Sequence, residues 1–303
     1  MPPPPSRPPV TPSSTRLPPP ASKPSPQAAR TPAKTFSIAP WDSAAEGQKI
    51  ILYGKSGVGK TTLATLFPDP VFIGLDDGGR RIHNPKTGKP VNAIAGVDTY
   101  QDTRDAIQQS LGLVPVGGTL VIDTVTRLEA LAERHVLETV KTEKGGTAAN
   151  LLAYGWGGGY RHLLDHIRLV LSDLDPLIRG GRNVVLLAQL AQATLSNSEG
   201  SDYSEDGPKL YHSKTVSLRT EVCEWADSVL RIGYADTRVE KENIQARAGK
   251  IVGDATRAIF SGGALWYVAK CRPINGKKLP PIVSFEHEQD DSLVQMLFNG
   301  AIP

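Results

Sequence analysis

The sequence has very little cysteine: Cys223 and Cys271 are its two cysteines among 303 residues. Their wide separation argues against a disulfide framework and favours a reducing compartment. No apolar run reaches the ~18 residues that a membrane-spanning helix needs, and the N-terminus lacks the apolar core of a signal peptide. These absences predict a cytoplasmic protein with no membrane partner.

Acidic residues are missing before Asp42, where prolines are abundant. Residues 1–40 hold 14 of the 25 prolines and five basic residues, so subtracting this +5 from the formal net charge of +3 leaves −2 for residues 41–303. Such a segment cannot bury enough apolar surface to offset its ordering entropy. We therefore predict a disordered, Pro-rich basic tail over 1–40 and one folded domain over 41–303. The tail is interpreted as a solvated leader, with a nucleic-acid arm or a docking peptide as alternatives.

Apolar runs of strand length alternate with amphipathic stretches of helix length beyond the tail. Strands that are apolar on both faces and alternate with helices indicate an α/β fold, with a mostly parallel central sheet covered by helices on both faces. From about residue 227, shorter β segments predict a β-rich C-terminal extension, antiparallel or mixed, at the sheet edge. The predicted strands are 49–54, 70–79, 118–126 and 183–189, the predicted helices are 60–67, 99–111, 127–140 and 160–178, and a hairpin is predicted over 81–94.

The segment GKSGVGKT, residues 54–61, fits the pattern G-x-x-x-x-G-K-[ST] between a strand and a helix. Glycines let the backbone curl so that its N–H groups form an anion nest, and the following helix adds its N-terminal dipole. Lys60 reaches the β- and γ-phosphates, and Thr61 ligates Mg²⁺. The motif predicts a site for ATP with Mg²⁺. The predicted nucleotide-binding residues are Gly54, Lys55, Ser56, Gly57, Val58, Gly59, Lys60, Thr61 and Thr62.

Polar residues at the carboxyl ends of other strands are the candidates for metal binding and catalysis. Asp123 ends the strand LVID and is the predicted second holder of the metal shell; the alternative is a helix cap. Thr124 stands where many ATPases of the AAA type have a catalytic glutamate, so the base must come from elsewhere. Asp76 is the first choice for general base and Asp77 the second, although a solvated turn is an open alternative. Gln189 is placed to sense the γ-phosphate, unless it is an ordinary polar strand end.

Together these motifs resemble the phage RecA-like P-loop ATPases, which include phage nucleotide-binding proteins and single-strand annealing recombinases. The likeness covers roughly residues 47–285, so it assigns 41–303 to a RecA-like ATP-binding domain. It implies ATP bound at a boundary between copies of the chain, oligomers in rings or filaments on single-stranded DNA, and the host cytoplasm if the chain is phage-encoded. It also implies that Lys270 and Arg272 of AKCRP approach the neighbouring subunit's nucleotide, with Arg272 stabilising transition-state charge. A pair of surface cations is the alternative.

Two irregular segments follow the third and fourth predicted strands, where RecA-like proteins hold DNA. Both mix cations with aromatic side chains, the combination that binds single-stranded DNA. Segments this long inside a domain are usually functional or disordered. In 141–160 the candidate contacts are Lys144 and Trp156, and in 196–219 they are Lys209, Tyr211, Lys214 and Arg219.

The sequence therefore predicts an ATP-hydrolysing, RecA-like protein that acts on single-stranded DNA in recombination or annealing. Two other functions stay open. One is a P-loop ATPase that serves as a helicase loader or packaging factor and responds to a protein partner. The other is a nucleotide-stabilised, DNA-binding scaffold with little turnover, since Asp76 stands where the resembling family usually has the longer glutamate.

Overall fold

The computed structural model describes Met1 and residues 46–76, 79, 81–195, 200–235, 238–240, 250–252, 256–274 and 276–299. Asp42–Pro303 forms one compact unit. The predicted tail lies outside the described residues except for Met1, as does Asp77. The strands of the main sheet are β1 (Lys49–Gly54), β2 (Pro70–Gly74), β3 (Asn92–Ala93), β4 (Thr119–Asp123), β5 (Asn183–Leu195), β6 (Tyr203–Pro208), β7 (Ser228–Tyr234), β10 (Arg257–Phe260), β11 (Lys270–Cys271) and β12 (Ile282–Phe285), and a separate hairpin joins β8 (Arg238–Glu240) to β9 (Lys250–Val252).

The centre of the sheet is parallel, as predicted. The order of the strands is β12-β10-β7-β1-β5-β4-β2-β3, and the pairs from β7 to β3 are all parallel. β10, β11 and β12 add the expected antiparallel extension. β7, which the sequence assigned to that extension, instead pairs directly with the P-loop strand β1. The predicted α/β fold with a mostly parallel central sheet is confirmed.

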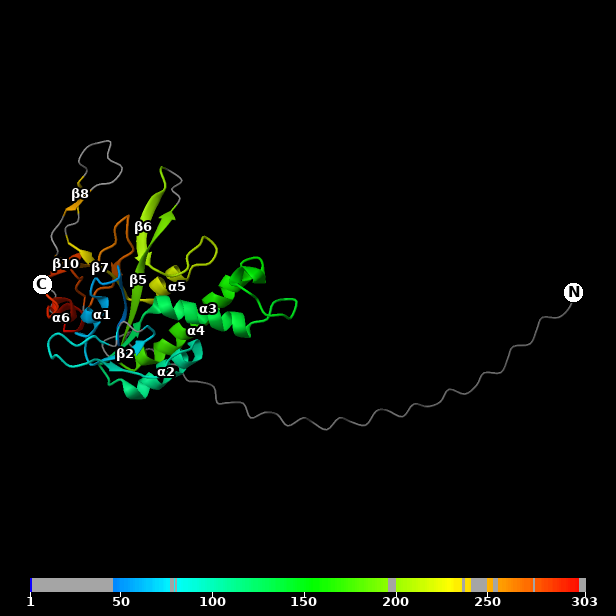
Figure 1. Ribbon diagram of the computed structural model, residues 1–303, viewed down its shortest axis with the longest axis horizontal. Coiled ribbons are helices and arrows are strands. Elements are labelled where there is room, and N and C mark those ends of the chain that lie inside the picture. Colours follow the sequence, from blue (N-terminus) through cyan, green and yellow to red (C-terminus); the bar gives the residue numbers. More distant parts are fainter. Residues whose placement is uncertain are drawn as a thin grey trace. The chain divides into compact units, whose positions relative to one another are not determined.

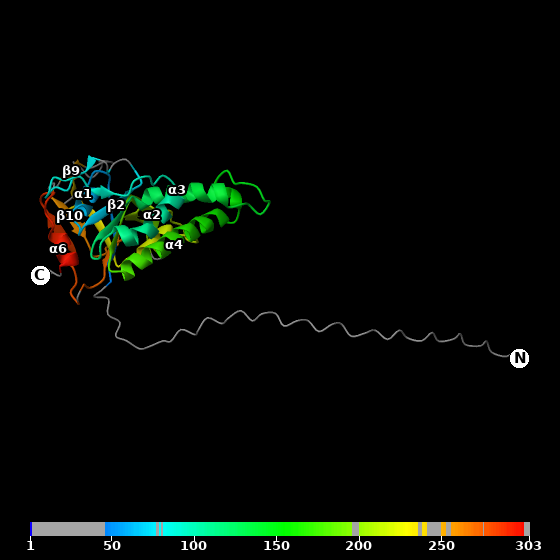
Figure 2. The same ribbon diagram turned by 90° about the horizontal axis from the view of Figure 1, so that it is seen from below.

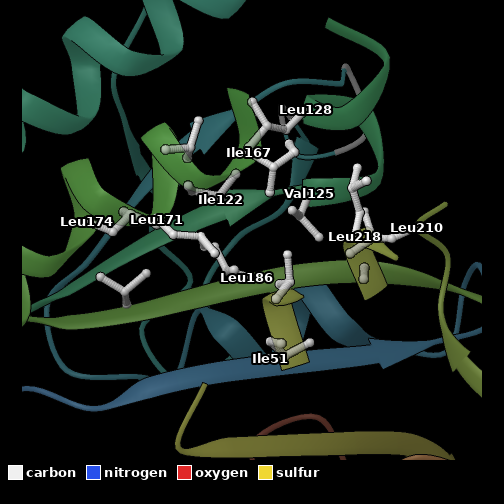
Figure 3. Close-up of a cluster of buried hydrophobic side chains, with 14 of the residues drawn as sticks. Ile51, Ile122, Val125, Leu128, Ile167, Leu171, Leu174, Leu186, Leu210 and Leu218 are labelled. Atoms are coloured by element: carbon white, nitrogen blue, oxygen red, sulfur yellow. The ribbon is translucent and has the colours of Figure 1, made fainter. Parts of the chain in front are cut away.

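Helices cover both faces of the sheet because successive strand residues point to opposite sides. On one face, Ile51 and Tyr53 join a core with four helices; on the other, Ile50 and Leu52 join a core with two. Figure 3 shows the first core, and Figures 1 and 2 show α3 and α4 side by side. The first face holds α2 (Tyr100–Leu113), α3 (Val125–Thr139), α4 (Gly158–Arg179) and α5 (Leu218–Trp225), and the second holds α1 (Lys60–Ala64) and α6 (Ser292–Phe298).

Several helices and strands begin or end at other residues than the sequence predicted. α1 ends at Ala64 rather than near Pro68, because residues 65 and 66 already form a turn. β5 continues past Gln189 to Leu195, where it pairs antiparallel with β6. The predicted hairpin over 81–94 reduces to a bridge between His83 and Pro90, followed by β3. Among the described helices, none is both long and apolar enough to span a membrane.

Candidate nucleotide site

The loop after β1 has the backbone that its glycines predicted. Gly57 and Gly59 have φ of 75° and 102°, in the left-handed region that other residues rarely adopt. Gly54 is required for a different reason: a Cβ on it would lie 2.5 Å from the carbonyl oxygen of Ile232 on β7. Val58 is buried and anchors the loop in the core. The loop then enters α1, whose first residue is Lys60.

Lys60 is 6% exposed, and its ammonium lies inside the loop. Nζ donates to the carbonyl oxygens of Gly54 and Lys55 at 3.0 and 2.9 Å, and to Oε1 of Gln189 at 3.3 Å. Burial lowers the pKa of Lys60, while the charges of Asp123 and Asp76 oppose that shift. The ammonium is thus held at the centre of the nest, where a phosphate chain would need it.

Thr61 and Asp123 meet as the motif predicted. The hydroxyl of Thr61 donates to Oδ2 of Asp123 at 2.8 Å. Asp123 is 5% exposed, at the end of β4, and burial raises its pKa. A hydroxyl and a carboxylate side by side are the hard oxygen ligands that Mg²⁺ prefers, so these residues fit the predicted metal site.

Asp76 lies just beyond β2, whose last residue, Gly74, is level with Asp123 in the sheet. The side chain of Asp76 is exposed. Its charge acts on the pKa values of both Lys60 and Asp123, which places it on the same side of the site. This position is compatible with the predicted role as general base.

Gln189 joins the site to the segment that follows it. Besides contacting Lys60, it donates its backbone N–H to Oγ1 of Thr126 at 3.1 Å, and its carbonyl accepts from the backbone N–H of Lys209 at 2.7 Å. Oγ1 of Thr126 in turn donates to the carbonyl of Lys209 at 3.1 Å. One residue therefore links the P-loop lysine to the base of the β5–β6 hairpin.

Arg257 is a candidate that the sequence reasoning missed. Its Nη1 lies 2.7 Å from where a Cβ of Gly59 would be, so the guanidinium lies against the P-loop. Its side chain is 31% exposed, and its ion-pair distance to the exposed Glu288 is long, 3.8 Å. Arg257 begins β10, which is separated from β1 by β7. No local motif marks it, because the contact depends on a long-range strand pairing.

Arg272 and Lys270 lie at the opposite end of the sheet. Nη1 of Arg272 is 2.9 Å from Oδ1 of Asp227, whose backbone N–H donates to the carbonyl of Lys49 at the start of β1. The P-loop begins at the other end of β1, about 16–20 Å away for a six-residue strand. The structure thus separates Arg272 from the nucleotide site of its own chain.

The first candidate DNA segment is more ordered than expected. It contains a 3-10 helix, η2 (Leu151–Tyr154), and the start of α4. Trp156 is 99% exposed with φ of 48°, and Lys144 is exposed. The ring of Tyr160 stacks on that of Tyr211 with centroids 4.0 Å apart, so the two candidate segments touch.

The second candidate segment is not the irregular loop that was predicted, since it contains β6 and the start of α5. Lys209 and Lys214 are exposed, and Tyr211 is half-buried against Tyr160. Arg219 is 5% exposed. Its guanidinium is therefore buried, unlike the exposed ammonium groups of Lys209 and Lys214.

The curled loop, the central lysine and the Thr61–Asp123 pair at the carboxyl end of a parallel sheet define a P-loop NTPase. The family model for AAA_24, described as an AAA domain, matches residues 46–258, more than two thirds of the chain. The chain belongs to this family of P-loop ATPases. A search of curated proteins gives no match.

Solved structures resemble the chain distantly. A prototypical ATPase from the type III secretion system of pathogenic bacteria shares 14% identity at a TM-score of 0.36, covering 62% of this chain and 52% of its own. KaiC-like protein PH0186 from Pyrococcus horikoshii OT3 shares 14% identity at a TM-score of 0.39, and the match covers 80% of this chain and 91% of that one. The RadB recombinase shares 12% identity at a TM-score of 0.38, and the match covers 80% of this chain and 89% of that one. The chain spans about half the length of the first of these, and likenesses this weak carry no conclusion about function.

Proposed function

We propose that this P-loop ATPase hydrolyses ATP and binds single-stranded DNA in a nucleotide-dependent manner, in recombination or strand annealing. The observation that carries the proposal is the position of Gln189, between Lys60 and the backbone of Lys209. A change at the γ-phosphate that moves the Gln189 amide also moves the base of the β5–β6 hairpin. The nucleotide state is thereby coupled to the segment that carries the candidate DNA contacts.

Each polar group of the site has a role in this proposal. Lys60 binds the β- and γ-phosphates as a point charge, and the loop amides bind the phosphate oxygens. Thr61 and Asp123 would hold Mg²⁺, which supplies charge neutralisation at the phosphates. Asp76 takes the proton of the attacking water, and Gln189 orients toward the γ-phosphate. Turnover is weak if the short side chain of Asp76 holds that water poorly.

The candidate DNA surface combines cations and aromatic rings from two segments. Trp156 and the Tyr160–Tyr211 stack supply aromatic groups, and Lys209 and Lys214 supply exposed charge. Stacking on a base contributes ~1–3 kcal/mol, and each lysine adds a salt-dependent contact with the backbone. This mixture favours single strands, whose bases are free to stack.

The proposal includes an oligomer in which Arg272 serves the neighbouring copy. Its side chain is 66% exposed and lies at the amino end of the sheet, away from its own nucleotide site. A head-to-tail arrangement of copies brings that end to a neighbour's carboxyl end, where an arginine stabilises the charge of the transition state.

The test measures ATP hydrolysis with and without oligo(dT), and the affinity for oligo(dT) in a non-hydrolysable ATP analogue and in ADP. We expect DNA to stimulate hydrolysis and the analogue to tighten binding at least tenfold. Gln189→Ala should keep nucleotide binding and lose that tenfold difference. The matched control, Gln109→Ala, alters an exposed residue on α2 and should keep it. Equal DNA affinity in both nucleotides would overturn the proposal.

The same assay separates the other functions. A loader or packaging factor would respond to a protein partner rather than to oligo(dT). A scaffold would bind ATP and DNA with little turnover, and Asp76→Glu, which lengthens the carboxylate, would then hydrolyse ATP faster than the wild type. If Asp76→Glu is no faster, the short carboxylate is not what limits turnover.

A further inference from the structure

Arg219, on the first turn of α5, is buried without the partners that a buried cation needs. It is 5% exposed, and neither Nε nor Nη1 donates a hydrogen bond to any described residue. Leaving a charged donor buried and unpaired is costly, and native proteins rarely do so without a reason. An anionic ligand in the neighbouring cavity would offset this buried charge.

Arg219 stands in the wall of a cavity of about 900 Å³. The cavity lies between α4, the outer half of β5, the loop over 210–217 and the start of α5; Figure 1 shows α5 beside the base of the β5–β6 hairpin. Its volume is in the range that accepts a small ligand. Ser217 and Thr220, at the start of α5, also line it. The backbone N–H groups there already have acceptors, since Leu218 donates to the carbonyl of Tyr211 and Thr220 donates to Oγ of Ser217.

The charges around the cavity favour an anion. Arg168, Lys214 and Arg219 line it, and Glu221 is the acid that lines it, engaged by Arg168 at 2.9 Å. Glu205 on the neighbouring β6 strand acts on His212 from outside the lining. Two cations, Lys214 and Arg219, therefore remain without a carboxylate of their own within the lining residues.

The pKa of His212 responds to the charge of Arg219. Its Nδ1 is 2.7 Å from Oγ of Ser217, the residue that caps α5. Partial burial and the charge of Arg219 lower the pKa of His212, and Glu205 opposes that shift. An anion placed beside Arg219 would offset the positive field at the ring and raise this pKa.

We infer that this cavity is a second phosphate-binding site, separate from the P-loop, in which Arg219 is the principal ligand and Lys214 assists. A guanidinium presents two parallel N–H groups that match two phosphate oxygens. The phosphate belongs either to a free phosphorylated molecule or to the backbone of single-stranded DNA. The site does not rest on the proposed function, since free phosphate binding would stand even if the protein bound no DNA.

The experiment uses the full chain with Lys60→Ala, so that the P-loop does not take up the probe. Titration calorimetry measures inorganic phosphate, dTMP and oligo(dT) binding, and NMR follows the pKa of His212. We expect the phosphate probes to bind and the His212 pKa to rise. Arg219→Met should weaken binding at least tenfold and abolish the rise. Arg179→Met, at an arginine that is 70% exposed on α4, should change neither.

The outcomes are distinct. Binding of inorganic phosphate or dTMP identifies a site for free phosphorylated molecules, and binding of oligo(dT) alone identifies a site for the DNA backbone. Thermal melting tests for misfolding. Since Nε and Nη1 of Arg219 have no hydrogen-bond partner among the described residues, Arg219→Met should melt no lower than its Lys60→Ala parent in phosphate-free buffer. If no probe binds, or if Arg219→Met binds as well as the Lys60→Ala parent, or melts well below it, the inference is overturned.

Discussion

The P-loop and the cavity beside α5 each contain a deeply buried cation, and the two cations are treated differently. Lys60 is 6% exposed and donates to three oxygens of the chain. Arg219 is 5% exposed, yet two of its three nitrogens donate to no described residue. In the P-loop region, backbone carbonyls already accept hydrogen bonds from the ammonium of Lys60 in the absence of a ligand. Among the described residues of the α5 region, none accepts from Nε or Nη1 of Arg219, and this difference motivates the inferred phosphate site.

Lys60→Ala tests the satisfied cation and should have the largest effect. Two charge-assisted hydrogen bonds to phosphate are worth about 3 kcal/mol or more, so ATP should bind on the order of a hundredfold or more weakly, and hydrolysis should become undetectable. The fold should persist, because burial disfavours the charge of Lys60 and its carbonyl partners can accept from water. Calorimetry measures the affinity for ATP, and thermal melting measures the stability of the fold. Lys89→Ala, an exposed lysine on the turn before β3, is the control and should bind ATP normally.

Asp123→Asn tests the acidic partner of that site. Burial raises the pKa of Asp123 above its unfolded value, so its favourable contribution to stability is present at low pH and is lost as pH rises through the folded pKa. At pH 8 the variant without ligand should therefore melt higher than the wild type, while the extra stabilisation by ATP that needs Mg²⁺ disappears. Melting curves with ATP, with and without Mg²⁺, measure this. A variant that keeps the full magnesium effect would remove Asp123 from the metal site.

Arg257→Gln tests whether a third cation belongs to the nucleotide region. A charged hydrogen bond to a phosphate or a ribose oxygen contributes roughly 1.5–3 kcal/mol, so ATP should bind about tenfold more weakly. Glu288→Gln removes the carboxylate that is 3.8 Å from Arg257 and leaves the guanidinium in place, so it should change affinity little. If both variants bind ATP like the wild type, Arg257 only packs against the loop.

Glu129→Gln should have the smallest effect and concerns the segment between the two regions. Glu129 accepts from the backbone N–H of Tyr211 at 2.9 Å. Burial and, to a lesser extent, Glu133 raise its pKa to about 7, against the lowering effects of the Tyr211 hydrogen bond and of Lys209. Since that pKa exceeds the unfolded value, stability falls as pH rises from about 4.5 through 7. The glutamine keeps an acceptor without the charge. As the pH rises from 5.5 to 8.5, the free energy of unfolding of Glu129→Gln should increase relative to that of the wild type by on the order of 1 kcal/mol, which corresponds to about 2–4 °C in Tm. A parallel pH dependence in both proteins would contradict the assignment.

The sequence identifies the P-loop region better than the region around α5, and the reason is physical. Lys60, Asp123 and Gln189 could be placed together because parallel strands end at the same edge of a sheet. Arg257 could not, since its contact with the loop depends on how β10 pairs across β7. For Arg219, residue type alone suggested an exposed cation, whereas the turn from β6 into α5 buries it.

The strand that separates Arg272 from its own P-loop has a consequence for kinetics. A single copy cannot bring this arginine to the nucleotide that it holds, so any acceleration by Arg272 must make the rate per chain rise with protein concentration. Copies that carry Lys60→Ala and copies that carry Arg272→Ala would each be poor alone, and mixing them would restore part of the activity. If Arg272 serves a neighbouring copy as proposed, the length of one six-residue strand makes ATP turnover a property of two chains together.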